Sequence, residues 1–190
     1  TPGTIFLDVD TDPENPTELG NYDSLYLHDG YVRGDTLYGA AVNDGVLVVI
    51  DVSDKANPIL LGNVTTPSSF THNVWLSDDG NTAFTTDEVS GAYITSYDVS
   101  NPSLIQELDR IRTRNTSNII PHNTHVLNDF LITSYYTAGV SIIDGSNPNI
   151  LIETGYFDSS PAFSGGTFNG NWGAYPFLPS GLLLINDMEE

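Results

Sequence analysis

The chain has 190 residues, of which 39% are hydrophobic and 11% aromatic, so it is long enough for one buried core and is not a disordered acidic tail. Its 25 acidic and 5 basic residues give a formal net charge of −20, which excludes a nucleic-acid-binding surface built from clustered Lys and Arg. It has no cysteine, which excludes disulfides, thiolate nucleophiles and Cys-ligated zinc, and its apolar runs are too short for a transmembrane segment.

A motif that starts with Asp and leads to Asn-Pro recurs four times along the chain. Its first residue is Asp8, Asp51, Asp98 and Asp144, at intervals of 43, 47 and 46 residues. A period in the low-to-mid forties with β-rich units is typical of propeller blades. The sequence therefore predicts an all-β fold, a β-propeller of four-stranded antiparallel blades.

The predicted elements form a half blade, three full blades and a second half blade. In chain order their approximate ranges are 5–20, 24–64, 70–109, 121–156 and 171–187. In the blade at 70–109, strands are expected at 72–76, 82–86, 92–99 and 104–108, with turns between them that contain Asp, Gly, Asn or Pro. The two half blades could join and close a ring of four, or residues 1–190 could be part of a larger ring. We favour the larger ring.

Several segments resemble known sequences. Residues 47–51 (LVVID) and 140–144 (VSIID) are similar to the LVIVD repeat. Residues 72–80, 86–88 and 172–181 resemble the choice-of-anchor B proteins, a family of secreted bacterial β-propellers with varied C-terminal sorting signals. The resemblance implies a secreted or cell-surface location, further blades, and contact with secretion or anchoring machinery through a segment not present here. It implies no particular reaction.

Three of the four histidines fall at the same position of the repeat, where the first strand of a blade begins. His28, His72 and His122 are each followed directly by Asp or Asn. Three positions after each histidine stands an aromatic or imidazole ring. The last repeat keeps that ring as Tyr175 but has Trp172 in place of the histidine. Since the second strand runs antiparallel to the first, its end returns to the same rim, and this places Asp87 and Glu88 near the histidines.

Two interpretations of the histidines are open. In the functional one, His28, His72 and His122 converge with carboxylates on a metal ion or a polar ligand, and the mixture of imidazole and carboxylate suits zinc, iron or manganese better than calcium. In the structural one, each histidine bonds the polar group at the end of the second strand of its own blade. Recurrence in each blade favours the structural interpretation.

Two other segments are candidates for ligand contact. Asp8, Asp10 and Asp12 have the alternate spacing of a calcium loop, but the central Gly and distal Glu of such a loop are missing, and the repeat already accounts for Asp8 and Asp10. Residues 157–171 form a Gly-rich insertion with Phe163 and Phe168, which would contact a sugar or a peptide, or would fill a gap in a blade.

Taken together, these features predict a secreted or cell-surface β-propeller that acts as a non-catalytic binding module for a protein or a glycan. The candidate ligand-binding residues are His28, His72, His122, Asp87, Glu88, Trp172 and Tyr175. One alternative is a metal-dependent hydrolase or lyase in which the three histidines hold the metal and Glu88 is the base. Another is a structural spacer or a secretion cargo segment. The cofactor, if any, would be a divalent metal, calcium or zinc.

Overall fold

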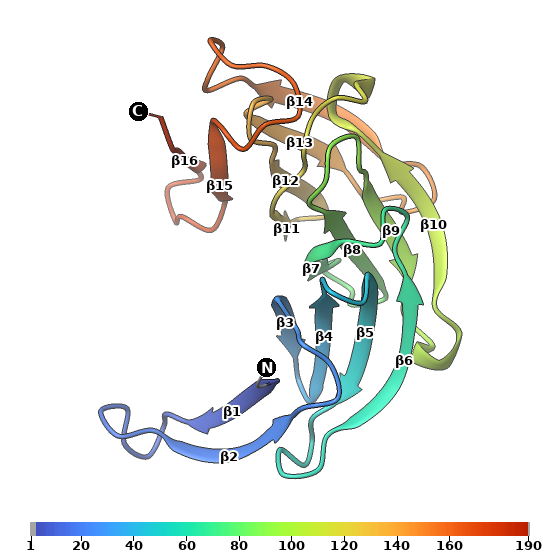
Figure 1. The fold of residues 1–190 in the computed structure, drawn as a ribbon, viewed down its shortest axis with the longest axis vertical. Helices are drawn as coiled ribbons and strands as arrows, with labels where there is room; N and C mark the ends of the chain where they lie inside the picture. The colour runs from blue at the N-terminus through green and yellow to red at the C-terminus, as the bar shows by residue number, and fades with distance from the viewer. Residues whose placement is uncertain (1–2, 190) are drawn as a thin grey trace.

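The computed structural model describes residues 3–189, which fold into five separate antiparallel sheets (Figure 1). The first sheet has two strands, β1 (Thr4–Asp8) and β2 (Thr17–Tyr22). The second contains β3 (Asp29–Arg33), β4 (Thr36–Ala41), β5 (Val46–Asp51) and β6 (Ile59–Thr65). The third contains β7 (Thr71–Leu76), β8 (Thr82–Asp87), β9 (Ile94–Asp98) and β10 (Gln106–Ile111).

The fourth sheet contains β11 (Thr124–Leu127), β12 (Phe130–Ser134), β13 (Val140–Asp144) and β14 (Ile152–Phe157). The last has two strands, β15 (Asn171–Tyr175) and β16 (Leu184–Asp187). Two short 3₁₀ turns, η1 (Pro102–Leu104) and η2 (Thr113–Asn115), flank β10. No helix among residues 3–189 has the length and apolar character that crossing a bilayer requires.

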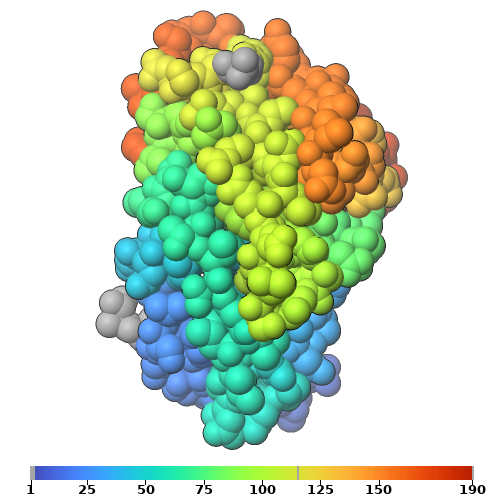
Figure 2. Space-filling model, turned by 90° about the vertical axis from the view of Figure 1, so that its right-hand side faces the viewer, coloured from blue at the N-terminus to red at the C-terminus, as the bar shows by residue number. Residues whose placement is uncertain are grey.

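The sheets are arranged along an open arc (Figure 1). Within each four-stranded sheet the strands follow one another in chain order, with the first strand on the inside of the arc and the fourth on the outside. Figure 2 shows the outer face, where β6 lies against η1. The β1–β2 and β15–β16 sheets lie at the two ends of the arc and do not pair with each other. This arrangement is that of a partial β-propeller, so the predicted fold class is confirmed.

Apolar side chains fill the spaces between neighbouring sheets. In β5, Leu47 and Val49 pack towards the β7–β10 sheet, whereas Val48 and Ile50 pack towards the β1–β2 sheet, and all four are fully buried. Because side chains alternate along a strand, a strand buried on both faces is a continuous apolar run. This explains why the apolar part of the repeat coincides with the third strand of each blade.

The recurring Asp ends these strands in one local turn. Its carboxylate accepts a hydrogen bond from the main-chain N–H two residues later, in the pairs Asp8–Asp10, Asp51–Ser53, Asp98–Ser100 and Asp144–Ser146 at 2.8–2.9 Å. Asp side chains are common in turns because they can bond their own backbone in this way. The most regular acidic position of the sequence is therefore a device for ending a strand.

Candidate functional site

The site lies at the inner ends of four sheets, and the first strands of two of them, β7 and β15, begin with a local irregularity. In the β7–β8 pair, Thr71 and Asn73 lie opposite Asp87 and Thr86, so His72 is an extra residue with no partner. In the β15–β16 pair, Trp172 is the extra residue in the same way. A β-bulge of this kind redirects a side chain out of the normal alternation of the strand.

The two other histidines occupy equivalent positions. The N–H of His28 bonds the carbonyl of Ala40, which is also the strand partner of Asp29. His122 lies two residues before β11 begins at Thr124, and its N–H bonds the carbonyl of Ser134. The shared sequence position of the three histidines thus corresponds to a shared place in the structure, at or just before the start of a first strand, and their side chains line one pocket.

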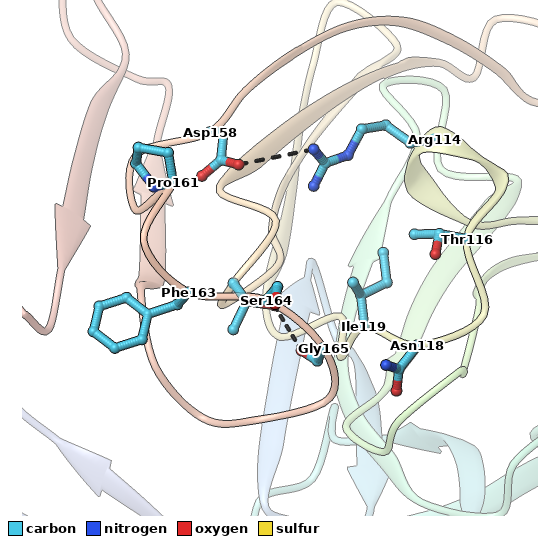
Figure 3. A pocket seen from close by; sticks show the side chains of 10 residues that line it. Arg114, Thr116, Asn118, Ile119, Asp158, Pro161, Phe163, Ser164 and Gly165 are labelled. Atoms are coloured by element: carbon cyan, nitrogen blue, oxygen red, sulfur yellow. Dashed lines mark hydrogen bonds and ion pairs between the residues drawn. The ribbon is translucent and has the colours of Figure 1, made fainter.

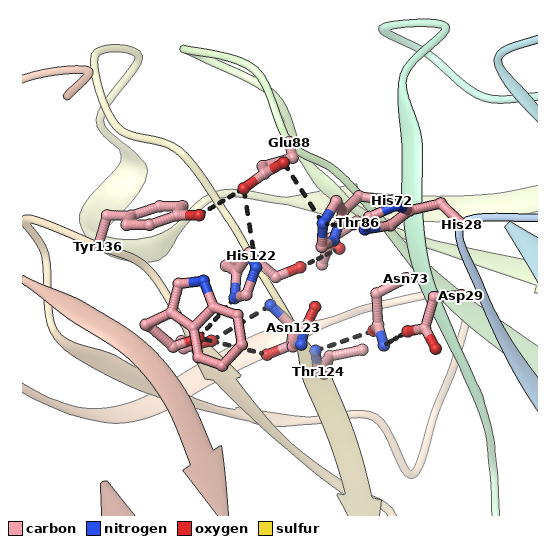
Figure 4. Close-up of polar contacts among 12 residues, drawn as sticks. His28, Asp29, His72, Asn73, Thr86, Glu88, His122, Asn123, Thr124 and Tyr136 are labelled. Carbon is pink, nitrogen blue, oxygen red and sulfur yellow. Dashed lines mark hydrogen bonds and ion pairs between the residues drawn. The ribbon is translucent and has the colours of Figure 1, made fainter. Parts of the chain in front are cut away.

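The histidines contact one another across sheets (Figure 4). Nε2 of His28 is 2.8 Å from Nε2 of His72. The carboxylate of Glu88 bridges the next two rings, with Oε2 3.3 Å from Nε2 of His72 and Oε1 3.7 Å from Nε2 of His122. The potential ligand atoms of His72, Glu88 and His122 all lie within 4.8 Å of one another. Within residues 3–189, this is the one such group of His, Asp or Glu side chains.

Further contacts fix the orientation of this group. The hydroxyl of Tyr136 donates to Oε1 of Glu88. Nδ1 of His122 bonds the main-chain carbonyl of Trp172, and the hydroxyl of Thr86 donates to the main-chain carbonyl of His122. Glu88 and His122 are therefore each held by a second residue from a neighbouring sheet or loop.

Burial decides the charge of two of the rings. Burial, followed by the neighbouring His28, lowers the pKa of His72 from 6.5 to about 4. Burial, followed by the neighbouring His72, lowers the pKa of His122 to about 4 as well. Both rings are therefore neutral at pH 7, and a neutral imidazole has a nitrogen lone pair with which to bind a metal or accept a hydrogen bond.

These side chains line an open pocket of about 440 Å³. It contains residues from four sheets or from the loops beside them: His28, Asp29, His72, Glu88, His122, Asn123 and Trp172. The half-exposed ring of Trp172 lies 5.0 Å, centroid to centroid, from the ring of His122. The pocket therefore combines an aromatic face with imidazole, amide and carboxylate groups.

Two of the residues predicted from the sequence lie elsewhere. The buried Asp87 accepts hydrogen bonds from the hydroxyl of Thr66 at 2.5 Å and from the N–H of Ser68 at 2.7 Å. These bonds fix the position of the loop before β7. Burial raises the pKa of Asp87, and these hydrogen bonds oppose the rise. Tyr175 lies in an aromatic cluster with His125 and Phe177, outside the pocket.

The acidic residues at the first hairpin do not converge. Asp8 accepts hydrogen bonds from Asp10 and Thr11, and Asp12 accepts them from Glu14 and Asn15. Asp10 and Asp12 are exposed and Asp8 is partly exposed, and the carboxylates of Asp8 and Asp12 bond residues of their own turns. The contacts correspond to turn formation, with no arrangement of Asp8, Asp10 and Asp12 around a common point.

The 157–171 insertion contributes to a second, larger pocket. It has a volume of about 690 Å³ and lies between the insertion and the segment that links β10 to β11 (Figure 3). Arg114 pairs with Asp158 at 3.8 Å, and the hydroxyl of Thr137 donates to the carbonyl of Gly165 at 2.7 Å. Phe163 is among the lining residues. The insertion also reaches the histidine site, since the ring of Phe168 meets that of Tyr136 edge-on.

The candidate ligand-binding residues predicted from the sequence do not include Tyr136, Asp29 or Asn73, although the end of the second strand places Tyr136 on the same rim. The amide of Asn73 donates to Asp29 at 2.6 Å and accepts from the N–H of Thr124 at 2.9 Å, so it links three sheets directly beneath the histidines. The available signal was the Asp or Asn that follows each repeated histidine. That signal could not show that these residues contact one another across sheets.

Comparison with known proteins supports the fold. Residues 31–66 match the model of the LVIVD repeat. A search of curated proteins finds no match. Among solved structures, the chain is similar to the periplasmic gluconolactonase PpgL of Pseudomonas aeruginosa, with a TM-score of 0.67 and 15% identity over 85% of this chain and 47% of that one.

Two further solved structures show the same likeness. A Lactobacillus plantarum protein matches with a TM-score of 0.67 and 15% identity, over 82% of this chain and 51% of that one. The β-propeller domain of Myceliophteria thermophila Cps50 (Swd1) matches with a TM-score of 0.57 and 12% identity, over 82% of this chain and 56% of that one. The chain thus spans about half the length of these structures. Residues 31–66 carry an LVIVD repeat, and the chain has the fold of a partial β-propeller.

Proposed function

We propose that this protein is a non-catalytic binding module whose ligand site is the pocket that His28, His72, Glu88, His122 and Trp172 line. The observation that carries the proposal is the convergence of polar side chains from three sheets, and of Trp172 from a fourth, on one open pocket of about 440 Å³. Ligand pockets combine an apolar surface with a few convergent polar groups, and this pocket has both.

The chemistry of the pocket favours a neutral, hydroxyl-rich ligand. Glu88 and Asp29 accept hydrogen bonds, neutral imidazoles both donate and accept, and an indole ring stacks against the face of a sugar. A net charge of −20 disfavours an anionic ligand. A saccharide, free or on a glycoprotein partner, satisfies these conditions. The resemblance to choice-of-anchor B proteins supports a secreted or cell-surface location, where such ligands are found.

The direct test compares two exposed aromatic residues of the same strand. Trp172 lines the pocket and Tyr175 does not, although the two are about equally exposed. Neutral oligosaccharides are screened against the 190-residue chain by ligand-observed NMR. Trp172→Ala is expected to abolish the binding that Tyr175→Ala preserves. Equal loss in both variants, or binding that survives Trp172→Ala unchanged, would place the ligand site elsewhere.

A second candidate is a metal-dependent hydrolase or lyase that uses the same pocket. The observation that favours it is Glu88, a carboxylate between two neutral imidazoles, together with the likeness to a protein named as a gluconolactonase. A carboxylate in that position can take a proton from a metal-bound water. The test is lactone hydrolysis with and without added zinc or manganese. Activity that requires the metal and disappears in Glu88→Gln would favour this reading over a binding module.

A further inference from the structure

The contacts of His122 leave its second nitrogen facing a carboxylate. A main-chain carbonyl can only accept, so the bond from His122 to the carbonyl of Trp172 requires the proton on Nδ1. In the neutral ring Nε2 then carries a lone pair, which faces Oε1 of Glu88 at 3.7 Å. Two electron-rich atoms in this arrangement repel each other unless a proton or a metal ion lies between them.

His72 has a related conflict. Its Nε2 approaches both Nε2 of His28, at 2.8 Å, and Oε2 of Glu88, at 3.3 Å. If this nitrogen accepts a hydrogen bond from the Nε2–H of His28, it has no proton to offer Glu88, and two electron-rich atoms again face each other. If it carries the proton itself, one hydrogen must serve both neighbours. Its other nitrogen, Nδ1, is buried and has no hydrogen-bond partner among residues 3–189 in either case.

We propose that one zinc-like transition-metal ion binds between Nε2 of His28, His72 and His122 and the carboxylate of Glu88. A single cation attracts all three lone pairs and the carboxylate, and so removes both conflicts. Three nitrogens and one oxygen form a ligand set that zinc accepts, whereas calcium prefers oxygen ligands only. The proposal deepens the binding function argued for this pocket, because the ion would form its inner wall.

Tetrahedral coordination requires movements of these side chains. With zinc–ligand bonds of about 2.0–2.1 Å, adjacent ligand atoms of a tetrahedron lie about 3.3–3.4 Å apart. The contacts of 2.8, 3.3 and 3.7 Å lie on both sides of that value. The ligand atoms of His72, Glu88 and His122 lie within 4.8 Å of one another, so they would move inward by up to about 1.5 Å. His28 lies outside that group, and its ring would have to move away from His72 and towards Glu88 and His122.

The surrounding contacts are those that orient metal ligands. A ligating histidine usually donates its other N–H to a carbonyl or carboxylate, as His122 does to Trp172. A ligating carboxylate is usually hydrogen-bonded in turn, as Glu88 is by Tyr136. Four protein ligands also make a closed site, typical of structural zinc, whereas a catalytic zinc keeps one position open. The ion would therefore clamp three sheets together and would leave no open position for hydrolysis.

The test uses the 190-residue chain after chelator treatment, titrated with zinc, cobalt(II) and calcium by calorimetry. We expect one zinc or cobalt per chain, visible absorption bands of tetrahedral cobalt, and no heat from calcium at the same concentration. Glu88→Gln and His122→Gln should weaken zinc binding by at least about 100-fold, whereas Tyr136→Phe, which removes only the supporting hydroxyl, should weaken it by about 10–100-fold.

Matched controls separate ligation from folding. His125→Gln changes a partly buried histidine outside the site, and Glu107→Gln removes a surface carboxylate, so both should retain wild-type zinc affinity. Circular dichroism reports whether each variant is folded. Absence of stoichiometric zinc or cobalt binding overturns the proposal, as does binding that survives both Glu88→Gln and His122→Gln. If no metal binds but oligosaccharides still do, the clamp is refuted and the binding function stands.

Discussion

Nε2 of His28 lies 2.8 Å from Nε2 of His72, although the two residues belong to different sheets and are 44 residues apart in the chain. One blade repeat separates them, so stacking of neighbouring sheets places equivalent positions side by side. Four of the five sheets each contribute one residue to a row of rings that runs from His28 through His72 and His122 to Trp172. The row forms because neighbouring sheets stack with equivalent positions side by side. Glu88 contacts the rings of His72 and His122, and this makes the row asymmetric.

Zinc should stabilise the folded chain. A ligand that binds only the folded state at 100 times its Kd adds about 2.7 kcal/mol to the free energy of unfolding. For a chain of this size that corresponds to a rise in Tm of roughly 5–11 °C. Thermal unfolding followed by circular dichroism, with zinc and then with excess EDTA, measures the shift. An equal rise in His122→Gln, or an equal rise with calcium, would contradict the assignment of the ligands.

Stability of the metal-free chain should fall as the pH falls from about 6.5 to about 4. The folded state keeps His72 and His122 neutral down to about pH 4, whereas the unfolded rings protonate near 6.5. The unfolded state thus binds more protons within this window, and each ring contributes a slope of up to about 1.4 kcal/mol per pH unit. Above about pH 6.5 and below about pH 4, these rings do not make the free energy of unfolding depend on pH.

Urea unfolding at pH 7, 6 and 5 measures this dependence. The other ionisable groups that face the two rings are His28, Asp29, Glu88 and Tyr136. The double variant described next keeps all four of them. The double variant His72→Gln and His122→Gln should show a flatter profile than the wild type, while His125 is unchanged in both. A free energy of unfolding that is constant or rises from pH 6.5 to 4.5 would show that the rings are not held neutral.

The adjacent acids Asp87 and Glu88 should separate stability from binding. Asp87→Ala removes a buried acceptor of three hydrogen bonds, from Thr66, Ser68 and Phe70, and should lower the free energy of unfolding by about 2–4 kcal/mol. It should leave zinc affinity nearly unchanged at temperatures where the variant is folded. Glu88→Gln should weaken zinc binding and leave the free energy of unfolding nearly unchanged. Urea unfolding and zinc titration of both variants check this, and interchangeable effects would refute the division of roles.

Trp172→Ala should separate the role of the Trp172 side chain from the role of its main-chain carbonyl. The contact with His122 uses the main-chain carbonyl, which the substitution keeps, whereas the indole ring lines the pocket. We expect zinc affinity within about threefold of the wild type and a loss of oligosaccharide binding. Titration of zinc and of the saccharide on the same sample measures both. A large loss of zinc affinity would indicate that the ring itself holds His122 in place.

The repeat made much of the fold predictable. The period of 43–47 residues, the apolar third strand and the Asp turn depend on local preferences, which a sequence displays directly. For the same reason the shared position of His28, His72 and His122 was visible. The structural interpretation, in which each histidine bonds the end of the second strand of its own blade, describes the contact of His72 with Glu88. His28 and His122 instead contact residues of neighbouring sheets.

The all-β repeat architecture and the rim on which the histidines lie follow from local patterns in the chain, because alternation and turn chemistry act over a few residues. Which side chains meet depends on how the sheets dock on one another. Asp87 and Glu88 are neighbours in the chain, yet the first is directed at the loop before β7 and the second at the histidines. Bulges at His72 and Trp172, and the docking of one sheet on the next, set these directions. Such contacts depend on distances between separate sheets, to which local sequence preferences do not extend.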